Sequence, residues 1–466
     1  MDPEVIDAFG RNLKALAERA NSDAVRKRDD DYLRRRTVAG DRDFLIACRH
    51  WNSSTPVIPR PYAEHSPYAR LASYGLGGGY FLTMNGVGVA VDPGYGFINL
   101  LYGAYGFTIC DIDAVFITHD HPDHWADLAN ILVLKNLARD KNDTESVEPA
   151  IYLGEALAGL RGFLSPSDLE GSVLRRRQVV TLHNRDGDVA ARVTALPAYH
   201  NERLVRKRNS PYALGFHFQI EDPKCDYPAR CQFPKCPRPG LRSIAIAGDT
   251  QFPDERKRKN GISEFTAADR QAFVSEYESV AALRRQGDCK LDHNVFDVLS
   301  MHIGSIEKEI AHVPSSGVLD HILTKAFYPG YHLGFAGCLR MLNSLFTGQH
   351  PNNKLAILTE FGEELRGNRV DIATVLERAA VANSGDAPLV RVVPADIGMA
   401  VQLNWHNDDE CPEWKLRCNR CLRMREAEAW PDKAFDPMAP DLFHPRSKMD
   451  IYEDLDTGLI QYCCHW

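Results

Sequence analysis

The chain has 466 residues, of which 44% are hydrophobic and 25% charged, and its formal net charge is −8. This composition is typical of a folded soluble protein that is long enough for a large core domain with appendages. The negative charge argues against a protein that coats nucleic acid through its overall field, although a local basic patch can still bind phosphate. No apolar run approaches the ~20 residues of a membrane-spanning helix, and the acidic, amphipathic start is unlike a secretory signal. A cytoplasmic protein without membrane contact is expected.

An N-terminal extension is predicted over residues 1–65. Its apolar residues recur at helical spacing and its dense charge is typical of a solvated helical face, which indicates a helix. A Pro-rich stretch over 56–67 indicates a linker. We expect the main domain at 66–405 and a Cys-rich C-terminal module at 406–466.

A β-hairpin is predicted at the start of the main domain. The apolar runs 80–84 and 87–91 flank Asn85 and Gly86, which accept the positive φ angles of a tight type I′ turn. The second run ends at Asp92, directly before Pro-Gly.

Strands and helices alternate through the rest of this domain. Residues 114–117 form a short, β-rich apolar run that fits a buried strand, and a helix is expected over about 126–137. Further strands are predicted at 149–153, 179–182, 191–196, 213–220 and 242–247, and helices near 154–163, 266–285, 334–345 and 369–381. The runs 389–393 and 399–403 are expected to close the domain as a pair of strands. This alternation favours an α/β layered fold.

A cluster of metal-binding residue types follows the predicted strand at 114–117. Three imidazoles and two carboxylates lie between His119 and His124. Imidazole and carboxylate are the usual ligands of zinc and similar ions. Alternate side chains of an extended segment share a face, so His119 and His121 can point at one ion. The chain turns at Pro122, which lets Asp123 and His124 point at a second ion.

The motif resembles the His-x-His-x-Asp-His signature of the metallo-β-lactamase superfamily, and the resemblance extends over about residues 70–405. The hairpin ending in Asp92, a His after a strand (His200) and an Asp within Gly-Asp-Thr (Asp249) occur in the order of that family. In the second half, Asp-Val-Leu-x-x-His and then His-Leu-Gly are similar to the RNase Z and phosphodiesterase branch. The implied fold is a four-layer αββα sandwich.

The resemblance also implies a centre of two divalent ions, Zn or Mn, with a hydroxide between them as nucleophile. The implied ligands are His119, His121 and His200 for one ion, Asp123 and His124 for the other, and Asp249 as a bridge between both. Two dications lower the pKa of a shared water toward neutrality and neutralise charge that develops on the substrate.

The sequence departs from the family at the last ligand of the second ion. The family supplies a His after a late strand, whereas Glu360 follows the apolar run 355–359 here. We predict that Glu360 is the ligand, and a solvated surface Glu is the alternative. His302 and His332 are the other candidates. Asp123 and His332 are the predicted catalytic residues, His332 as a general acid or as a residue that supports the ligands.

Two basic runs follow predicted ligands directly in the sequence. Arg206, Lys207 and Arg208 come shortly after His200, and residues 256–259 come shortly after Asp249. In an acidic protein, cations near the site favour an anionic substrate such as a phosphodiester in nucleic acid or a nucleotide. The alternative for each run is a solvated loop.

The cysteines fall into isolated residues and clusters. Cys48, Cys110, Cys289 and Cys338 have apolar neighbours and are expected to be small core side chains. The C-terminal candidates for a structural zinc site are Cys411, Cys418, Cys421, Cys463, Cys464 and His465. A second cluster over 225–236 has three cysteines that fit either a zinc site or a loop without metal.

The leading prediction is a metal-dependent hydrolase that cleaves a phosphodiester. A lactone, ester or amide hydrolase of the same fold is a second reading. A third is a non-catalytic regulatory subunit that binds a nucleotide or a protein. The intact signature argues against the third reading, and Glu360 keeps it open. The sequence leaves an oligomer or a protein partner open as well.

Overall fold

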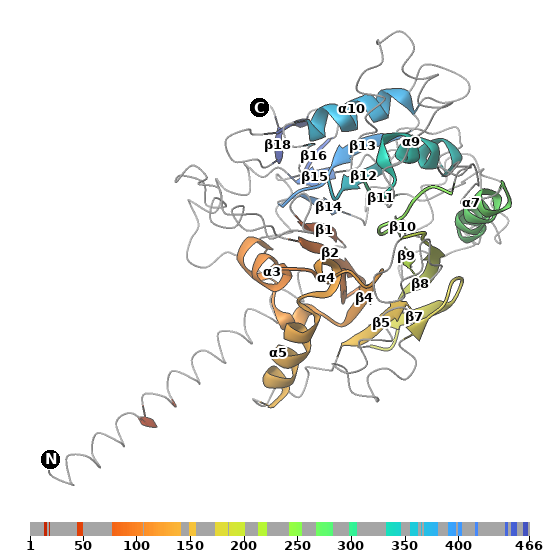
Figure 1. Ribbon diagram of the computed structural model, residues 1–466. Coiled ribbons are helices and arrows are strands. Elements are labelled where there is room, and N and C mark those ends of the chain that lie inside the picture. The colour runs from red at the N-terminus through yellow and green to blue at the C-terminus, as the bar shows by residue number, and fades with distance from the viewer. Residues whose placement is uncertain are drawn as a thin grey trace, which may run out of the picture.

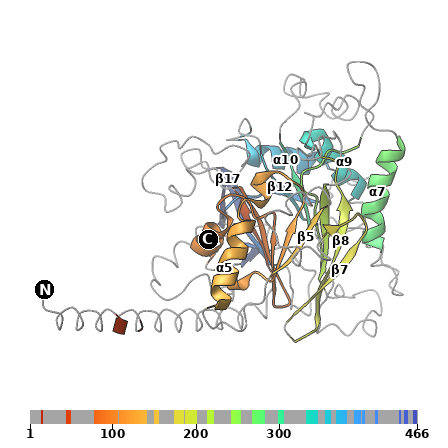
Figure 2. The same ribbon diagram turned by 60° about the horizontal axis from the view of Figure 1, so that its bottom comes forward.

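Two β-sheets lie face to face in the computed structural model, with helices on both outer faces (Figure 1, Figure 2). The structure describes residues 14–15, 18, 44–49, 77–105, 107–140, 149–154, 173–184, 186–200, 213–220, 242–253, 267–282, 298–304, 332–345, 355–361, 365, 368–380, 390–397, 399–402, 415–417, 443–445, 449–453 and 460–464. None of the helices in these ranges is long and apolar enough to cross a membrane.

The first sheet has nine strands among the described residues, in the order β16-β15-β14-β1-β2-β3-β4-β5-β6. They are β1 (Phe44–Arg49), β2 (Gly77–Met84), β3 (Val87–Val91), β4 (Ala114–Ile117), β5 (Ala150–Gly154), β6 (Val173–Leu174), β14 (Ala400–Gln402), β15 (Lys415–Arg417) and β16 (Phe443–Pro445). Strands β3 to β6 run parallel, which brings their carboxyl ends to one edge.

The second sheet has seven described strands in the order β13-β12-β11-β10-β9-β8-β7. They are β7 (Val179–His183), β8 (Val189–Pro197), β9 (Leu214–Ile220), β10 (Arg242–Ile246), β11 (Val298–His302), β12 (Leu355–Thr359) and β13 (Arg391–Pro394). Strands β10 to β13 are parallel. A separate hairpin joins β17 (Met449–Glu453) to β18 (Ile460–Cys464).

Helices cover the outer face of each sheet, which makes the predicted αββα sandwich. The first sheet packs against α3 (Phe97–Tyr105), α4 (Pro122–Trp125) and α5 (Leu128–Asp140), and the short helix η1 (Ile109–Asp111) precedes β4. The second sheet packs against α7 (Ala267–Ala282), α9 (Gly334–Leu345) and α10 (Arg369–Ala379). The fold class expected from the sequence is confirmed.

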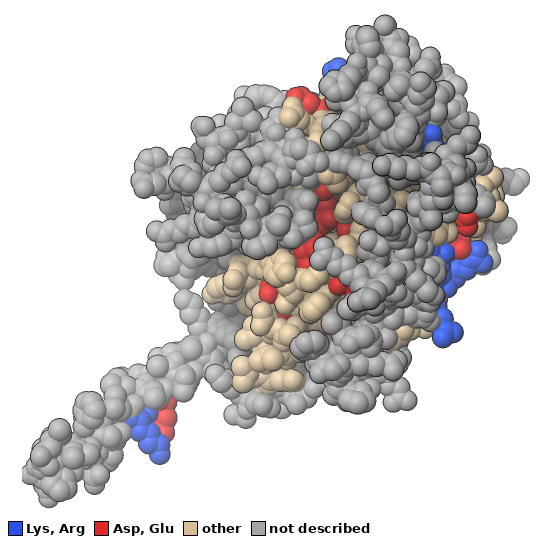
Figure 3. All heavy atoms as spheres, in the orientation of Figure 1, with Lys and Arg blue, Asp and Glu red and all other residues tan. Residues whose placement is uncertain are grey.

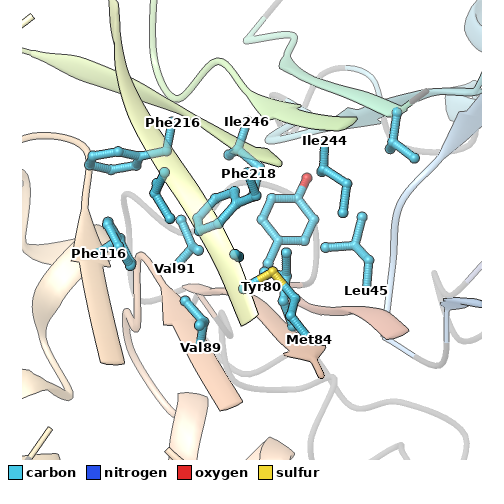
Figure 4. Close-up of a cluster of buried hydrophobic side chains, with 14 of the residues drawn as sticks. Leu45, Tyr80, Met84, Val89, Val91, Phe116, Phe216, Phe218, Ile244 and Ile246 are labelled. Carbon is cyan, nitrogen blue, oxygen red and sulfur yellow. The ribbon is translucent and has the colours of Figure 1, made fainter. Parts of the chain in front are cut away.

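The largest hydrophobic cluster of the described residues fills the space between the sheets (Figure 4). Phe116 of the first sheet lies edge-on against Phe216 and Phe218 of the second, at ring-centroid distances of 5.1 and 5.3 Å. Each buried side chain of this size contributes roughly 1.5–3 kcal/mol to folding. The Tyr80 hydroxyl also meets the Ser300 hydroxyl across the interface at 2.5 Å. Apolar contact and this polar link fix one sheet against the other.

The hairpin β2–β3 forms as the Asn-Gly pair predicts. Asn85 has φ 47° and Gly86 has φ 83°, the positive values that a type I′ turn requires. Tyr80 pairs with Val91 and Met84 with Val87. The hairpin therefore ends with Asp92 at the edge that carries the site.

The prediction that the last two strands of the domain pair with each other is wrong. Strand β13 belongs to the second sheet, whereas β14 lies in the first sheet between β1 and β15. The segment between them connects the two sheets, and its buried Asp396 carboxylate accepts hydrogen bonds from the Ile397 and Ile460 amides and pairs with Arg369. Short spacing in the sequence suggested a hairpin, but this buried carboxylate anchors a crossing segment.

Residues outside the predicted main domain contribute strands to its first sheet. Strand β1 lies within the N-terminal extension predicted at 1–65, and it pairs with β2 and β14 in the middle of the sheet. Strands β15 and β16 from the predicted C-terminal module extend the same sheet. The linker expected at 56–67 and the helix expected at 154–163 lie outside the described residues.

Asp396 is expected to stabilise the crossing between the sheets strongly. Asp396→Ala should lower the free energy of unfolding by about 3–5 kcal/mol, because it leaves the buried Arg369 charge without its carboxylate. Urea denaturation measures this loss. Asp186→Ala, at an exposed carboxylate, should change stability by about 0.5 kcal/mol or less. An equally small effect at Asp396 would contradict the role of this anchor.

Candidate metal centre

The predicted ligands gather where strands of both sheets end. Strands β1, β3 and β4 of the first sheet and β8, β10, β11 and β12 of the second end at this common edge. The residues that follow or end these strands are Arg49, Asp92, His119, His200, Asp249, His302 and Glu360. Positions far apart in the sequence therefore meet in one buried cluster.

The segment after β4 turns into the short helix α4, as the proline predicts. His121 stands before the helix in an extended conformation, with φ −75° and ψ 134°, and Pro122 is its first residue. Proline suits this position because it has no amide hydrogen to leave unpaired. The Trp125 indole donates a hydrogen bond to the Asp120 carbonyl at 3.0 Å, which closes the turn. Asp123 and His124 are buried as a result.

Asp92 holds this segment from the end of the hairpin. Its carboxylate accepts hydrogen bonds from the Thr118 amide at 2.7 Å and the Thr118 hydroxyl at 2.8 Å. It also pairs with His124 Nδ1 at 2.9 Å. Because the single Thr118 hydroxyl proton goes to Asp92, the hydroxyl accepts from His119 Nδ1 at 3.0 Å. Both imidazoles are thus oriented through Nδ1, so that Nε2 of each faces the centre.

A first group of ligand atoms comes from His119, His121, His200 and Asp249, all within 4.8 Å of one another. Asp249 Oδ2 lies 3.4 Å from His119 Nε2 and 3.7 Å from His200 Nε2. His200 Nε2 lies 3.2 Å from His121 Nδ1. Ligand atoms around a tetrahedral zinc with bonds of ~2.1 Å are about 3.4 Å apart, so these spacings suit one ion.

A second group consists of Asp123, His124 and Glu360. His124 Nε2 lies 3.7 Å from Asp123 Oδ2 and 3.4 Å from Glu360 Oε1. Asp249 Oδ2 is 3.6 Å from His124 Nε2, which places Asp249 between the two groups. Glu360 is 4% exposed and has φ 55°, a strained conformation for a residue with a side chain. The alternative of a solvated surface Glu is therefore wrong.

The donor set fits a divalent ion. The Nε2 atoms of His119 and His124 are buried and have no hydrogen-bond partner among the described residues. Such buried polar atoms cost free energy unless a partner satisfies them. Imidazole and carboxylate together are the ligands that Zn and Mn take in proteins.

His302 and His332 both lie near Oδ1 of Asp249 and are not part of the first group; His332, Asp249 and Glu360 form a third group of possible ligand atoms. His302 Nδ1 donates to Asp249 Oδ1 at 2.5 Å, so His302 supports that carboxylate. His332 Nδ1 is 3.6 Å from the same oxygen, and its side chain is 29% exposed. A Cβ on Gly304 would lie 2.8 Å from the His332 ring, so the glycine makes room for that side chain.

Burial and charge shift the pKa values of the centre in opposite directions. Burial lowers the pKa of His119 well below its ordinary value. Burial alone would raise the pKa of Asp249, but the histidines around it, His332 first, hold that pKa well below its usual range. Burial also acts to lower the pKa of His124, yet carboxylates, Asp92 first among them, raise it to about 9. An ion that binds at His124 must displace its proton.

Arg49 is the member of this cluster that sequence reasoning missed. Its side chain is 2% exposed, it forms an ion pair with Glu360, and its Nη2 donates to the Asp123 carbonyl at 3.3 Å. The available signal was the apolar run 44–48, which ends in this arginine. The run forms the buried strand β1 and is not part of a helical extension.

Several predicted functional residues lie outside the described part of the chain, and their roles stay predictions. These are Arg206, Lys207, Arg208, Cys411, Cys418, Cys421 and His465, together with the cysteines over 225–236. Cys463 and Cys464 lie in strand β18. Of the isolated cysteines, Cys48, Cys110 and Cys338 are buried as expected.

The described residues place acidic and basic side chains on different parts of the face in Figure 3. Figure 3 shows Asp and Glu atoms gathered in the middle of this face, whereas the Lys and Arg atoms of the described residues lie toward its edges. An anionic substrate would need cations to offset this negative charge.

Residues 89–229 match the family described as the Beta-lactamase superfamily domain. This stretch contains Asp92, the whole signature and His200. No curated protein matches the chain.

Several solved structures are also similar to the chain. The metallo-β-lactamase fold protein YhfI from Bacillus subtilis has 12% identity and a TM-score of 0.43, with 78% of this chain and 99% of that chain covered. A diphosphatase from the PhnP family has 13% identity and a TM-score of 0.39, with 78% and 99% covered. A long-form RNase Z from yeast has 11% identity and a TM-score of 0.40, with 77% and 41% covered.

Asp92 is expected to set the metal affinity without being a ligand. Asp92→Ala should weaken metal binding by about 10- to 100-fold, because it frees the Thr118 and His124 side chains that it orients. Competition with a chromophoric chelator measures the affinity. Asp113→Ala is the matched control, since that carboxylate accepts a bond from the Gly88 amide in the same sheet and is not among the ligand groups. Equal affinities in both variants would contradict this role.

Proposed function

This chain carries a domain of the metallo-β-lactamase superfamily, and from that premise we propose that it is a metal-dependent hydrolase acting on a phosphodiester. The observation that supports the proposal most directly is the convergence of His119, His121, His200 and Asp249 on one point, where buried His119 Nε2 has no hydrogen bond from the described residues. These four residues are the proposed ligands of a divalent ion. When bound, the ion would make a water molecule acidic enough to act as a nucleophile at neutral pH.

His332 is the proposed general acid for the leaving group. It is partly exposed, so a substrate can reach it, and it faces the Asp249 carboxylate. Its partly buried position would lower its pKa, but Asp249 raises that pKa above the ordinary value. His332 therefore holds its proton more tightly than a free imidazole does, which suits a group that donates a proton to a departing oxygen.

A phosphodiester, in nucleic acid or a nucleotide, is the proposed substrate class. Arg206, Lys207 and Arg208 follow the proposed ligand His200 within eight residues, and in a chain of net charge −8 they supply local positive charge. Guanidinium and ammonium groups bind phosphate oxygens by charge-assisted hydrogen bonds. The Asp and Glu atoms of described residues in the middle of the face in Figure 3 favour a second candidate, a neutral lactone, ester or amide, which needs no such compensation.

The metal-loaded protein is expected to hydrolyse bis(p-nitrophenyl) phosphate faster than a lactone or a nitrophenyl ester. His119→Ala combined with His121→Ala should remove the ion and abolish turnover while the chain stays folded. Absorbance assays, elemental analysis and thermal melting give the three readouts. Faster lactone or ester hydrolysis would favour the second candidate, and full metal retention in the double variant would refute the site.

His332→Gln is expected to affect substrates according to their leaving group. For a diester with an alkyl leaving group, kcat should fall by about 100-fold or more, because proton donation contributes on this scale. With p-nitrophenolate, which departs without a proton, kcat should change little. His183→Gln, at an exposed histidine of β7, is the matched control. Equal losses on both substrates would show that His332 does not act as the acid.

The basic run after His200 is expected to determine affinity for an anionic substrate. Replacing Arg206, Lys207 and Arg208 with Ala should raise KM several-fold and flatten its dependence on salt, because screened charge contacts are lost. Arg175→Ala with Arg177→Ala, at exposed arginines, should leave both properties unchanged. The test is to measure KM across a salt series. An unaltered KM in the triple variant would indicate that these residues form a solvated loop that does not bind substrate.

A further inference from the structure

The Arg49 guanidinium lies against residues of the second group of possible ligands. Arg49 extends from the end of β1 and pairs with Glu360 Oε1. That same oxygen lies 3.4 Å from His124 Nε2, so it is the oxygen that belongs to the second group. Arg49 Nη2 also donates to the backbone carbonyl of Asp123. The guanidinium thus contacts two of the three residues of this group.

A fixed positive charge at this position opposes a second cation. A guanidinium keeps its proton at any ordinary pH. Two like charges a few ångströms apart repel strongly where little water screens them, and Arg49 and Glu360 are 2% and 4% exposed. One oxygen of Glu360 is already engaged with Arg49, and the other lies 3.7 Å from His302 Nδ1.

The pairing also accounts for the departure from the family pattern. A His at position 360 would place an imidazole against the buried guanidinium and remove the carboxylate that pairs with it. A Glu at this position neutralises Arg49, and a buried arginine requires such a partner. The Glu at position 360 and the buried Arg49 on β1 are therefore explained together, as the two partners of one ion pair.

We propose that Arg49 fills the second cation position, so that the centre holds one divalent ion rather than the two expected from the resemblance. The ion lies at His119, His121, His200 and Asp249, and Arg49 with Glu360 supplies a permanent charge pair beside it. This inference rests on the proposed metal-dependent hydrolase.

The test counts ions by equilibrium titration of the metal-free full chain with Mn²⁺, followed by electron paramagnetic resonance. Mn²⁺ is chosen because thiolates select Zn over Mn, so the cysteines add little to the count. The wild type is expected to bind one Mn²⁺ with the spectrum of an isolated ion. Arg49→Met, which has similar length and no charge, is expected to gain a second Mn²⁺ and the spectrum of an exchange-coupled pair.

Two further variants control this experiment. Arg49→Lys keeps the charge and should still bind one ion. Arg369→Met removes another fully buried arginine that pairs with a carboxylate, outside the ligand groups, and should also bind one ion. A second ion in Arg369→Met would mean that general loosening, not the Arg49 charge, governs the count.

The wild-type count decides the inference even if Arg49→Met does not fold. Two coupled Mn²⁺ ions in the wild type would overturn the inference and leave the proposed function intact. An unchanged count of one in folded Arg49→Met would also overturn it. A wild type that binds no ion, or a His119→Ala, His121→Ala variant that binds as the wild type does, would refute the metal centre itself.

Discussion

The contacts of the Asp92 carboxylate hold the candidate centre together. They tie the end of the β2–β3 hairpin to the start of the signature segment through the amide and hydroxyl of Thr118, and to His124. The hydroxyl in turn orients His119. Asp92 adopts φ 52°, a strained conformation that persists because its own amide and carbonyl are bonded to Phe116 and Gly79. One buried acid therefore sets the direction of two imidazoles that a metal would need.

Several buried carboxylates lie close together around Asp92, and the cationic side chains nearby neutralise only part of their negative charge. Asp123, Asp249 and Glu360 are nearly inaccessible to water, and Asp249 lies between both ligand groups. Buried carboxylates persist when cations or hydrogen-bond donors surround them. Arg49 provides one such cation, and the imidazole nitrogens directed at Asp249 fit a divalent ion as the other. The same buried carboxylates therefore need cations for stability and provide ligands for the proposed metal ion.

The two sheets bring the centre together because each supplies part of it. The first sheet carries the signature, and the second carries His200, Asp249 and Glu360 at the ends of β8, β10 and β12. The aromatic interface between the sheets and the buried Asp396 at their crossing keep these ends in register. Contacts between the two sheets therefore stabilise the sandwich and also hold the ligands at their relative positions.

Local patterns in the sequence determined the elements and the ligand types. The Asn-Gly turn, the apolar run before His119 and the proline of the signature each have a local physical cause, and the structure follows them. The resemblance supplied His200 and Asp249, which no local pattern identifies. Only the tertiary structure decided how distant segments meet. Strand β1 joins the middle of the sheet, β13 and β14 separate into different sheets, and Arg49 reaches Glu360 across 311 positions. Sequence periodicity reports which face of an element is apolar, but not which partner covers it.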